Sequence, residues 1–388
     1  MNALGIIFSY VEKDNMRELT KVRTLASLPI GGKYRIIDFF LSNFVNNNIH
    51  DVMIVTKNNY HSLIDHVDAG KEWDLTRKRG GLRIMTPFQS PENKSNEVYG
   101  TTIEALANHM HAIKRSLADY VILTRCNLIN NIDYKDLLRQ HIETNADITA
   151  VYTNNSDPSL SVPFDTPVFT VAEDGKIVDV HLPSEEKGRR AEDIRANPFL
   201  TRNCEKGCCM GVFVMRKSLL ESLVGDSMAY GRIHFYRDVL LRIVNYLNIQ
   251  GYEYKKYFMG IDSISTYLRA NMSLLDIDIR NQVFEDVVYT KVKDSVPTEY
   301  VEGCKVRNSI ISDGCRIEGT VENCVLSRGV RIGSGSIVKN CVIMQNTSVM
   351  NNVELDYVIL DKDVIVRDDR RIAGHETFPV VIEKASIV

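Results

Sequence analysis

The C-terminal part of the chain, from about residue 301, repeats a short pattern of aliphatic residues. Turns rich in Gly, Asn, Asp and Ser separate the aliphatic positions, which recur every five to six residues. Such repeats bury their apolar side chains only by stacking on neighbouring repeats. The pattern therefore predicts a parallel β-solenoid with triangular coils. Pairs of adjacent aliphatic residues mark its coils, 15 to 17 residues apart, at Ile310-Ile311, Val325-Leu326, Val342-Ile343 and Val358-Ile359.

Each side of a triangular coil contributes one inward residue, so the repeat also predicts the solenoid core. The cysteines before two of the pairs, Cys324 and Cys341, should stack on adjacent coils and serve packing. A solenoid end exposes strand edges and invites contact with another domain or subunit. The predicted inward residues are Ile317, Ile332, Val349 and Ile365 after the pairs, and Val306, Val321, Ile337 and Val353 before them.

The first 260 residues follow a different pattern, in which apolar strand-like runs alternate with amphipathic segments. This alternation predicts an α/β domain with a mostly parallel sheet and helices on both faces. We expect a linker helix and connection over residues 261–300, with the helix at 263–279, and the solenoid domain over 301–388. Residues 183–198 predict an exposed polar loop. The expected strands are 3–8, 51–56, 120–124, 146–153 and 209–215, and the helical segments are 101–117 and 134–145.

Composition excludes several classes of protein. The formal net charge of −3 gives no argument for binding nucleic acid or an anionic membrane. No apolar run reaches the roughly 20 residues of a membrane span, and the N-terminus lacks the regions of a signal peptide. We therefore expect a cytoplasmic protein, with its eight cysteines reduced. Cys204, Cys208 and Cys209 could bind a metal, but their spacing matches no common zinc site, so packing is the other interpretation.

The N-terminal strand leads into a segment that is unusual for a nucleotide-binding fold. Residues 9–19, SYVEKDNMREL, contain no glycine. A glycine-rich loop after the first strand is what lets backbone amides approach a phosphate. The chain thus begins like a nucleotide-binding enzyme but lacks this feature.

Several longer motifs are spread over nearly the whole chain. They are PIGGKYRIIDFFLSN (29–43), GKEWDLTRKRGGLRIMTP (70–87), YGTTIEALANH (99–109), MGVFVM (210–215) and TYLRANMSLL (266–275). Together they resemble the sequences of the ADP-glucose pyrophosphorylases, the glucose-1-phosphate adenylyltransferases. The resemblance implies a Rossmann-like nucleotidyltransferase domain, a C-terminal left-handed parallel β-helix and assembly as a tetramer.

The same resemblance implies that the active site is degenerate. That reaction joins two anions and needs Mg²⁺, held by two carboxylates, and cations on the phosphates. Here neutral residues stand where the family has its phosphate-binding Arg and Lys, its two metal-binding Asp and its sugar-phosphate Glu-Lys pair. In that order they are Asn15, Leu25, Asn127, Gly260, and His181-Leu182. We therefore expect no catalytic residue, metal or firmly bound cofactor in this chain.

A degenerate member of this kind is similar to the D-type regulatory subunit of Gram-positive bacteria. The resemblance implies a regulatory role in glycogen biosynthesis beside a catalytic subunit that holds Mg²⁺, in a heterotetramer, with a homo-oligomer possible alone. One alternative is an active adenylyltransferase with a rearranged metal site that uses Asp262. Another is a free-standing sensor of sugar phosphates or nucleotides.

The resemblance also implies residues that could still bind ligands. In the family, sugar-phosphate effectors bind between the two domains, and Arg forks suit phosphate oxygens. The alternative for Arg35 is an ion pair with Asp38 that anchors the segment. The regulatory-phosphate candidates are Arg23, Lys33 and Arg35, and the remnants of the substrate pocket are Gly100, Thr101, Gly211 and Asp238.

Overall fold

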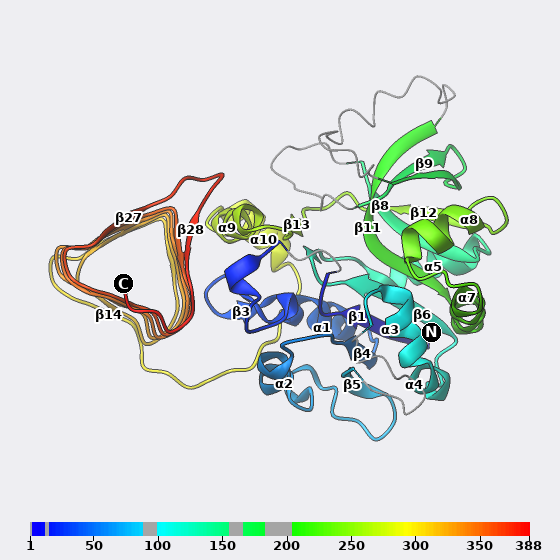
Figure 1. Cartoon of the computed structure of the whole chain (residues 1–388), viewed down its shortest axis with the longest axis horizontal. Helices are drawn as coiled ribbons and strands as arrows, with labels where there is room; N and C mark the ends of the chain where they lie inside the picture. Colours follow the sequence, from blue (N-terminus) through cyan, green and yellow to red (C-terminus); the bar gives the residue numbers. More distant parts are fainter. Residues whose placement is uncertain (1, 12–14, 88–98, 155–165, 183–203) are drawn as a thin grey trace.

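The computed structural model describes residues 2–11, 15–87, 99–154, 166–182 and 204–388 (Figure 1). An α/β domain is followed by two linker helices and a triangular stack of coils. The predicted polar loop at 183–198 lies outside the described residues. No helix in the described part of the chain is long and apolar enough to cross a membrane.

A nine-stranded sheet forms the centre of the α/β domain, and its strands confirm the five predicted ones. One half is parallel, in the order β6-β1-β4-β5, and β11 joins the other half to it by antiparallel pairing. The parallel strands are β1 (Ala3–Phe8), β4 (Asp51–Val55), β5 (Gly81–Met85) and β6 (Tyr120–Arg125). The other half has β8 (Ile148–Thr153), β9 (Val168–Ala172), β10 (Ile177–His181), β11 (Cys204–Arg216) and β12 (Ile249–Glu253).

Helices cover both faces of this sheet, as predicted. Alternate side chains of β1 point to opposite faces, so Ile7 lies in one core cluster and Ile6 in the other. The first face is covered by α1 (Ile36–Asn46), α2 (His61–Val67) and α5 (Tyr134–Glu143). The second face is covered by α3 (Thr102–Asn108), α4 (Met110–Arg115) and α7 (Lys217–Ala229), and α8 (Leu241–Ile243) follows a π-helical turn at Phe235–Leu240.

The helix expected at 263–279 is two helices, α9 (Ile264–Ser273) and α10 (Ile277–Val283). The break follows from Asp276, whose carboxylate accepts from the amides of Asp278 and Ile279 and so caps α10. Short paired strands lie nearby. They are β2 (Pro29–Ile30) with β3 (Tyr34–Arg35), and β7 (Leu128–Ile129) with β13 (Met259–Gly260).

The C-terminal domain is the predicted parallel β-helix, with three five-stranded parallel sheets as its sides. The first side has β14 (Glu299–Tyr300), β17 (Arg316–Ile317), β20 (Arg331–Ile332), β23 (Ser348–Val349) and β26 (Ile365–Val366). The second has β15 (Lys305–Arg307), β18 (Thr320–Glu322), β21 (Ile337–Lys339), β24 (Glu354–Asp356) and β27 (Arg371–Ala373). The third has β16 (Ile310–Ile311), β19 (Val325–Leu326), β22 (Val342–Ile343), β25 (Val358–Leu360) and β28 (Val380–Ile382).

The register of the coils corrects part of the predicted core. Val349 pairs with Val366, which is buried, while the predicted Ile365 is 36% exposed. The column that starts at Val306 and Val321 continues at Val338 and Leu355. The predicted Ile337 is 38% exposed, whereas the predicted Val353 is buried in the β-helix core but lies outside this column. The physical reason is that backbone pairing sets the register, and a one-residue shift turns a side chain to the other face.

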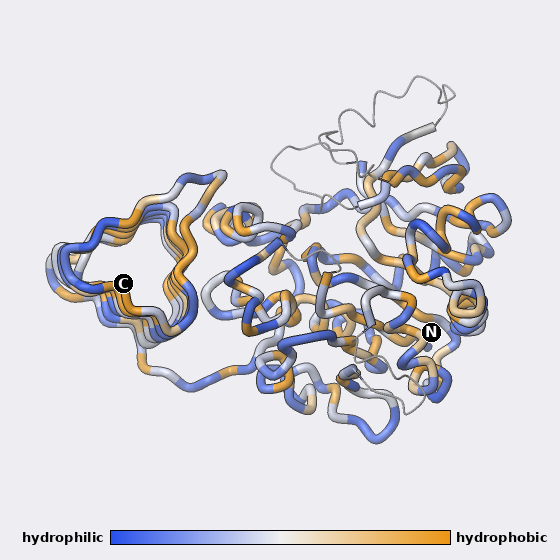
Figure 2. The backbone as a smooth tube through the Cα atoms, in the orientation of Figure 1, coloured by the Kyte–Doolittle hydropathy of each residue, from blue (hydrophilic) through white to orange (hydrophobic). Residues whose placement is uncertain are grey.

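The third side explains why the aliphatic residues come in pairs. The second member of a pair, such as Leu326, points into the coil core, and the first, such as Val325, packs on the α/β domain. In the fourth coil these roles fall to Ile359-Leu360 and not to Val358-Ile359, because Val342 pairs with Ile359. Figure 2 shows this side, at β28, as an apolar band facing α9 and α10.

The cysteines follow the packing interpretation where the structure describes them. Pairing of Val325 with Val342 brings Cys324 and Cys341 together on adjacent coils, as predicted, and both are buried. Cys208 and Cys209 lie buried in β11, where burial raises the pKa of the Cys209 thiol to about 12. A buried, protonated thiol of this kind is a poor metal ligand.

Candidate functional site

The two positions that the resemblance assigns to metal-binding aspartates lie side by side. Gly260 pairs with Leu128, and the Ile261 amide donates to the Asn127 carbonyl at 2.8 Å. Asn127 is a buried amide and Gly260 has no side chain, so neither residue offers Mg²⁺ a carboxylate. In the described part of the chain, no three His, Cys, Asp or Glu side chains gather as a metal site. The residues at this position therefore do not fit Mg²⁺.

Asp262, the carboxylate of the alternative metal site, lies at the start of α9. The Thr266 hydroxyl is 3.0 Å from Asp262 Oδ1, and the amides of Asp262 and Ser263 donate to the same hydroxyl. The Ser263 hydroxyl in turn accepts from the Thr266 amide and closes a capping box. Asp262 thus takes part in a helix-capping network at the start of α9.

The remaining degenerate positions have structural contacts of their own. Leu25 is 2% exposed in the main core, where a lysine ammonium would be buried. His181 ends the edge strand β10, and its Nε2 lies 3.2 Å from the Thr170 hydroxyl on β9. Leu182 directly follows His181. Asn15 is exposed and bridges to the segment before α9. None of these positions places a cation in the cleft.

Arg125 occupies the space beside the pocket remnant Gly211. Its guanidinium carbon lies 4.6 Å from the centre of the Tyr236 ring, a cation–π contact. A Cβ at Gly211, where φ is +69°, would lie 3.4 Å from Arg125 Cδ. The cavity lined by these side chains and by Phe213 has a volume of about 20 Å³. That is room for about one water molecule and not for a nucleotide.

The other pocket remnants serve as helix caps. The Glu104 carboxylate accepts from the amides of Gly100 and Thr101 at 2.8 and 3.0 Å, and the Thr101 hydroxyl accepts from the Glu104 amide. The Asp238 carboxylate accepts from the amides of Ile233 and His234 at 3.1 and 3.0 Å. Local backbone needs account for all three residues without a ligand.

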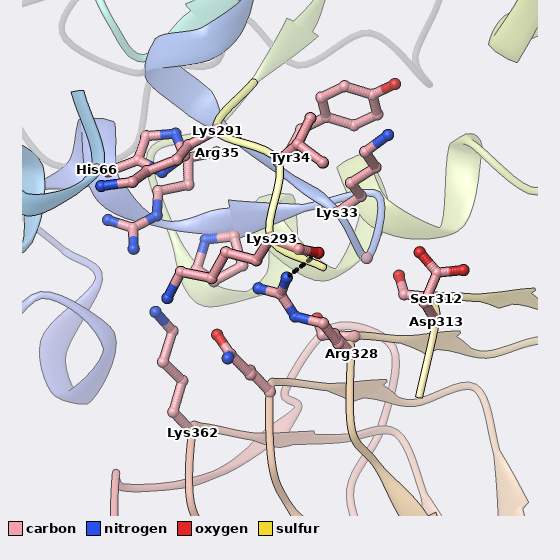
Figure 3. Close-up of a pocket in the computed structure, with 15 residues that line it drawn as sticks. Lys33, Tyr34, Arg35, His66, Lys291, Lys293, Ser312, Asp313, Arg328 and Lys362 are labelled. Atoms are coloured by element: carbon pink, nitrogen blue, oxygen red, sulfur yellow. Dashed lines mark hydrogen bonds between the residues drawn. The ribbon is translucent and has the colours of Figure 1, made fainter. Parts of the chain in front are cut away.

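A second cavity, of about 110 Å³, opens between the α/β domain and the β-helix (Figure 3). Its walls come from the β2–β3 hairpin, the linker after α10 and the turns of the β-helix. A site so rich in cations attracts anions. Six of the residues that line it are basic and one is acidic, namely Lys33, Arg35, Lys291, Lys293, Arg328 and Lys362, with Asp313.

Arg35 is held in the cavity wall by Ser62. Its Nη1 donates to the Ser62 carbonyl at 2.6 Å and lies 3.0 Å from the Ser62 hydroxyl, which leaves Nε and Nη2 for an anion. The alternative interpretation, an ion pair between the Arg35 side chain and Asp38, is wrong about which Arg35 group meets Asp38. Asp38 does anchor the segment, but it accepts from the Arg35 backbone amide at 2.9 Å and contacts His66 at 2.6 Å.

Burial changes the basicity of two cavity residues. Burial, and then the charges of Arg35 and Arg23, lower the pKa of Lys362 to about 7. Burial also lowers the pKa of Arg35 to about 10, so this guanidinium stays charged at neutral pH. Lys362 is therefore about half protonated near pH 7, and a bound anion would draw a proton onto it.

Arg23 does not line this cavity. It is 2% exposed, and its guanidinium forms an ion pair with Asp361, which is 1% exposed, at 2.8 Å. The structure thus places two of the three regulatory candidates, Lys33 and Arg35, on the cavity and buries the third in the contact between the domains. That these residues bind phosphate stays a prediction.

Two family models match the two domains. Residues 14–160 match the nucleotidyl transferase family, and residues 294–377 match the GlmU-like C-terminal hexapeptide family. Over its full length the chain is similar to glycogen biosynthesis protein GlgD of Bacillus subtilis, with 32% identity over 99% of this chain and 96% of that protein.

The chain belongs to the GlgD family.

Two further relatives agree with this assignment. The GlgD protein of Geobacillus stearothermophilus is 33% identical over 86% of this chain and 82% of that protein. A glucose-1-phosphate adenylyltransferase of Fervidobacterium nodosum is 28% identical over 96% of this chain and 86% of that protein. The predicted resemblance to ADP-glucose pyrophosphorylases, and to their D-type subunit, is thus confirmed.

The sequence of this GlgD-family chain did not lead us to predict four of the basic residues that line the cavity. A signal existed for two of them, because Arg328 and Lys362 each lie two residues after an aliphatic pair. Asp313 and Gln345 hold the same position in their own coils and also line the cavity. One repeat position thus forms a wall of the site. No repeat contains Lys291 and Lys293, and only the folded linker brings them there.

Proposed function

We propose that this chain is a regulatory subunit in glycogen biosynthesis, which assembles with a catalytic glucose-1-phosphate adenylyltransferase and does little or no adenylyl transfer itself. Its relatives include proteins named for glycogen biosynthesis and for that transferase activity. The observation that carries the proposal is the adjacency of Asn127 and Gly260, the positions at which the family resemblance expects Mg²⁺-binding carboxylates.

The chemistry of the reaction explains why this matters. ATP and glucose 1-phosphate give ADP-glucose and diphosphate, so catalysis depends on positioning two anions and neutralising their charge. Loss of one such contact typically lowers the rate by roughly 10²–10³. Leu25 and Asn15 remove further cations from the same cleft, so we expect the chain's own turnover to be negligible. In our proposal Mg²⁺ belongs to the catalytic partner.

The cavity between the domains supplies a means of regulation in this proposal. A phosphorylated effector would contact Arg35 from the α/β domain together with Arg328 and Lys362 from the β-helix. Such a ligand favours the arrangement of domains in which all three can reach it. A subunit interface that senses this arrangement would shift the partner between states of low and high activity.

The experiment compares the purified chain with the chain co-expressed beside the catalytic homologue from the same genome. We expect no ADP-glucose from the chain alone with Mg²⁺, ATP and glucose 1-phosphate. We expect the two proteins to co-purify, and the partner's response to sugar-phosphate effectors to change. The double variant K293Q/R328Q should co-purify with the catalytic homologue equally well. In its presence, however, the homologue should respond to sugar-phosphate effectors as it does when alone.

Two other outcomes would favour the alternative functions. Turnover by the chain alone that disappears in D262N, with the fold retained, would favour the active enzyme with a rearranged metal site. Effector binding without any association with the catalytic homologue would favour the free-standing sensor.

A further inference from the structure

A third cavity lies at the opposite edge of the sheet from Asn127 and Gly260. Its volume is about 570 Å³, within the range of small-molecule sites. Ala3 at the start of β1 and Asp51 at the start of β4 line it, and so does Gly80 just before β5. It therefore opens at the amino ends of three parallel strands, on the side of the α/β domain away from the β-helix (Figure 1).

Arginine side chains dominate the walls of this cavity. Arg77, Arg79, Arg83 and Arg115 line it, and Asp51 is the one acidic residue among the described residues that do. Asp51 is already engaged, since it forms an ion pair with Arg83 and accepts from the Ser116 hydroxyl at 2.6 Å. The lining residues thus keep a formal surplus of three positive charges, before the pairing of Arg77 with the rim residue Asp74 is counted.

The arginines differ in how far their charge is already balanced. Arg77 pairs with Asp74 at 2.6 Å on the rim. Arg79 and Arg115 are exposed, and no contact to a described residue accounts for either guanidinium. Guanidinium groups in a concave site recognise phosphate oxygens by paired hydrogen bonds.

Two buried polar atoms on lining residues also lack partners among the described residues. They are the Nε of Arg83 and the Nδ1 of His50. Both atoms are buried, so a ligand in the cavity would contact the exposed guanidinium groups of Arg79 and Arg115 rather than these atoms. Burial, and then the charge of Arg77, lower the pKa of His50, so its ring is neutral at pH 7.

From this geometry we propose that the cavity, here called the arginine pocket, binds a small molecule that carries two or more phosphate groups. Several guanidinium groups on separate walls, one from α4 and the others from the segment at β5, exceed what a single phosphate needs. The cavity is concave and not a stripe along the surface, which favours a compact ligand over a polymer. The assignment does not depend on the regulatory function proposed above.

Titration calorimetry with inorganic pyrophosphate tests the proposal on the full chain. The test variant is R79Q/R115Q, which removes two exposed charges without breaking a described contact. The matched control is K293Q/R328Q, which removes two charges from the cavity between the domains. We expect R79Q/R115Q to weaken one class of site at least tenfold, an effect that the control lacks. Both variants should keep the unfolding midpoint of the unmodified chain.

A second readout locates the ligand. Pyrophosphate should shift the NMR signal of the His50 ring, which H50Q identifies, in the unmodified chain and in K293Q/R328Q but not in R79Q/R115Q. Unchanged pyrophosphate binding in R79Q/R115Q, or binding that only K293Q/R328Q removes, would overturn the proposal. So would an oligoglutamate peptide that displaces pyrophosphate from the His50 site at lower concentration, because the ligand would then be an acidic segment of a partner. If the unmodified chain binds pyrophosphate at the His50 site but shows no binding that K293Q/R328Q removes, the proposed regulatory function loses its effector site. The arginine pocket is unaffected by that result.

Discussion

At the scale of single residues, Asn127 and Gly260 stand where the family resemblance predicts metal-binding aspartates. Asn127 directly precedes β7 and Gly260 lies on β13, so the two positions are neighbours, and neither supplies a carboxylate. The sequence could predict both positions, because the motifs around them are retained. The sequence could not predict that the Arg125 side chain fills the space beside Gly211, because this depends on the direction of one long side chain.

Restoring the two carboxylates should create a metal site. We expect N127D/G260D to bind Mn²⁺, a spectroscopic substitute for Mg²⁺, with one ion per chain, because hard cations prefer carboxylate oxygens. Electron paramagnetic resonance of free Mn²⁺ measures this directly. The control N127L/G260A should bind no more Mn²⁺ than the unmodified chain. Equal Mn²⁺ binding by all three proteins would show that these positions are not the family's metal site.

Lys362 should make anion binding in the interdomain cavity depend on pH. Its pKa of about 7 lies below the ordinary value of 10.5, so the group gains its proton as the pH falls through 7. Sulfate keeps its charge over this range, and its affinity should rise by up to about tenfold from pH 8 to pH 6. Calorimetry at each pH measures the change. The same rise in K362M would refute the role of Lys362.

At the scale of elements, the β-helix depends on close contact between its coils. Gly333 directly follows β20, and a Cβ there would lie 2.6 Å from the Met350 carbonyl group in the next coil. A backbone atom in a stacked coil cannot move aside as a flexible side chain can. The paired aliphatic residues of the third side are also a property of this element, because one member of each pair packs in the β-helix core and the other packs on the α/β domain.

Substitution of Gly333 by alanine should therefore destabilise the chain. We expect G333A to lower the free energy of unfolding by about 1–3 kcal/mol, the usual cost of overpacking. The control is G225A in the exposed part of α7, where an added Cβ meets nothing within 4 Å. That change should stabilise by about 0.5–1 kcal/mol through helix propensity. Urea titrations of both variants measure the two signs, and a stabilised G333A would contradict the stacking argument.

At the scale of the whole molecule, the two domains share one hydrophobic core. Val325, Val342 and Ile359 of the β-helix belong to the same buried cluster as α1 and α9. The buried ion pair of Arg23 with Asp361 and the exposed pair of Lys21 with Glu383 join the same two domains. This joint core is what holds the cationic cavity in shape.

The two ion pairs should differ strongly in their energetic weight. D361N leaves the Arg23 charge buried without a counter-charge and should cost about 3–5 kcal/mol of unfolding free energy. K21A removes a pair whose side chains are 64% and 47% exposed, and should cost less than about 1 kcal/mol. Denaturant titration measures both, and R23M/D361L should recover much of the loss. A D361N variant as stable as K21A would mean that the buried pair does not couple the domains.

The sequence by itself determined the β-helix and the alternating strands and helices of the α/β domain, and it predicted neutral residues at the positions where the family resemblance implies carboxylates and cations. These features are local, because a repeat period or a substituted motif can be read without knowing what lies beside it. The exact column of inward residues, such as Val366 in place of Ile365, needed the backbone pairing between coils. Only the tertiary structure decided where the remaining charges gather. Lys33, Lys293 and Lys362 come from three separate segments, and they meet because the apolar outer face of the β-helix packs on the α/β domain.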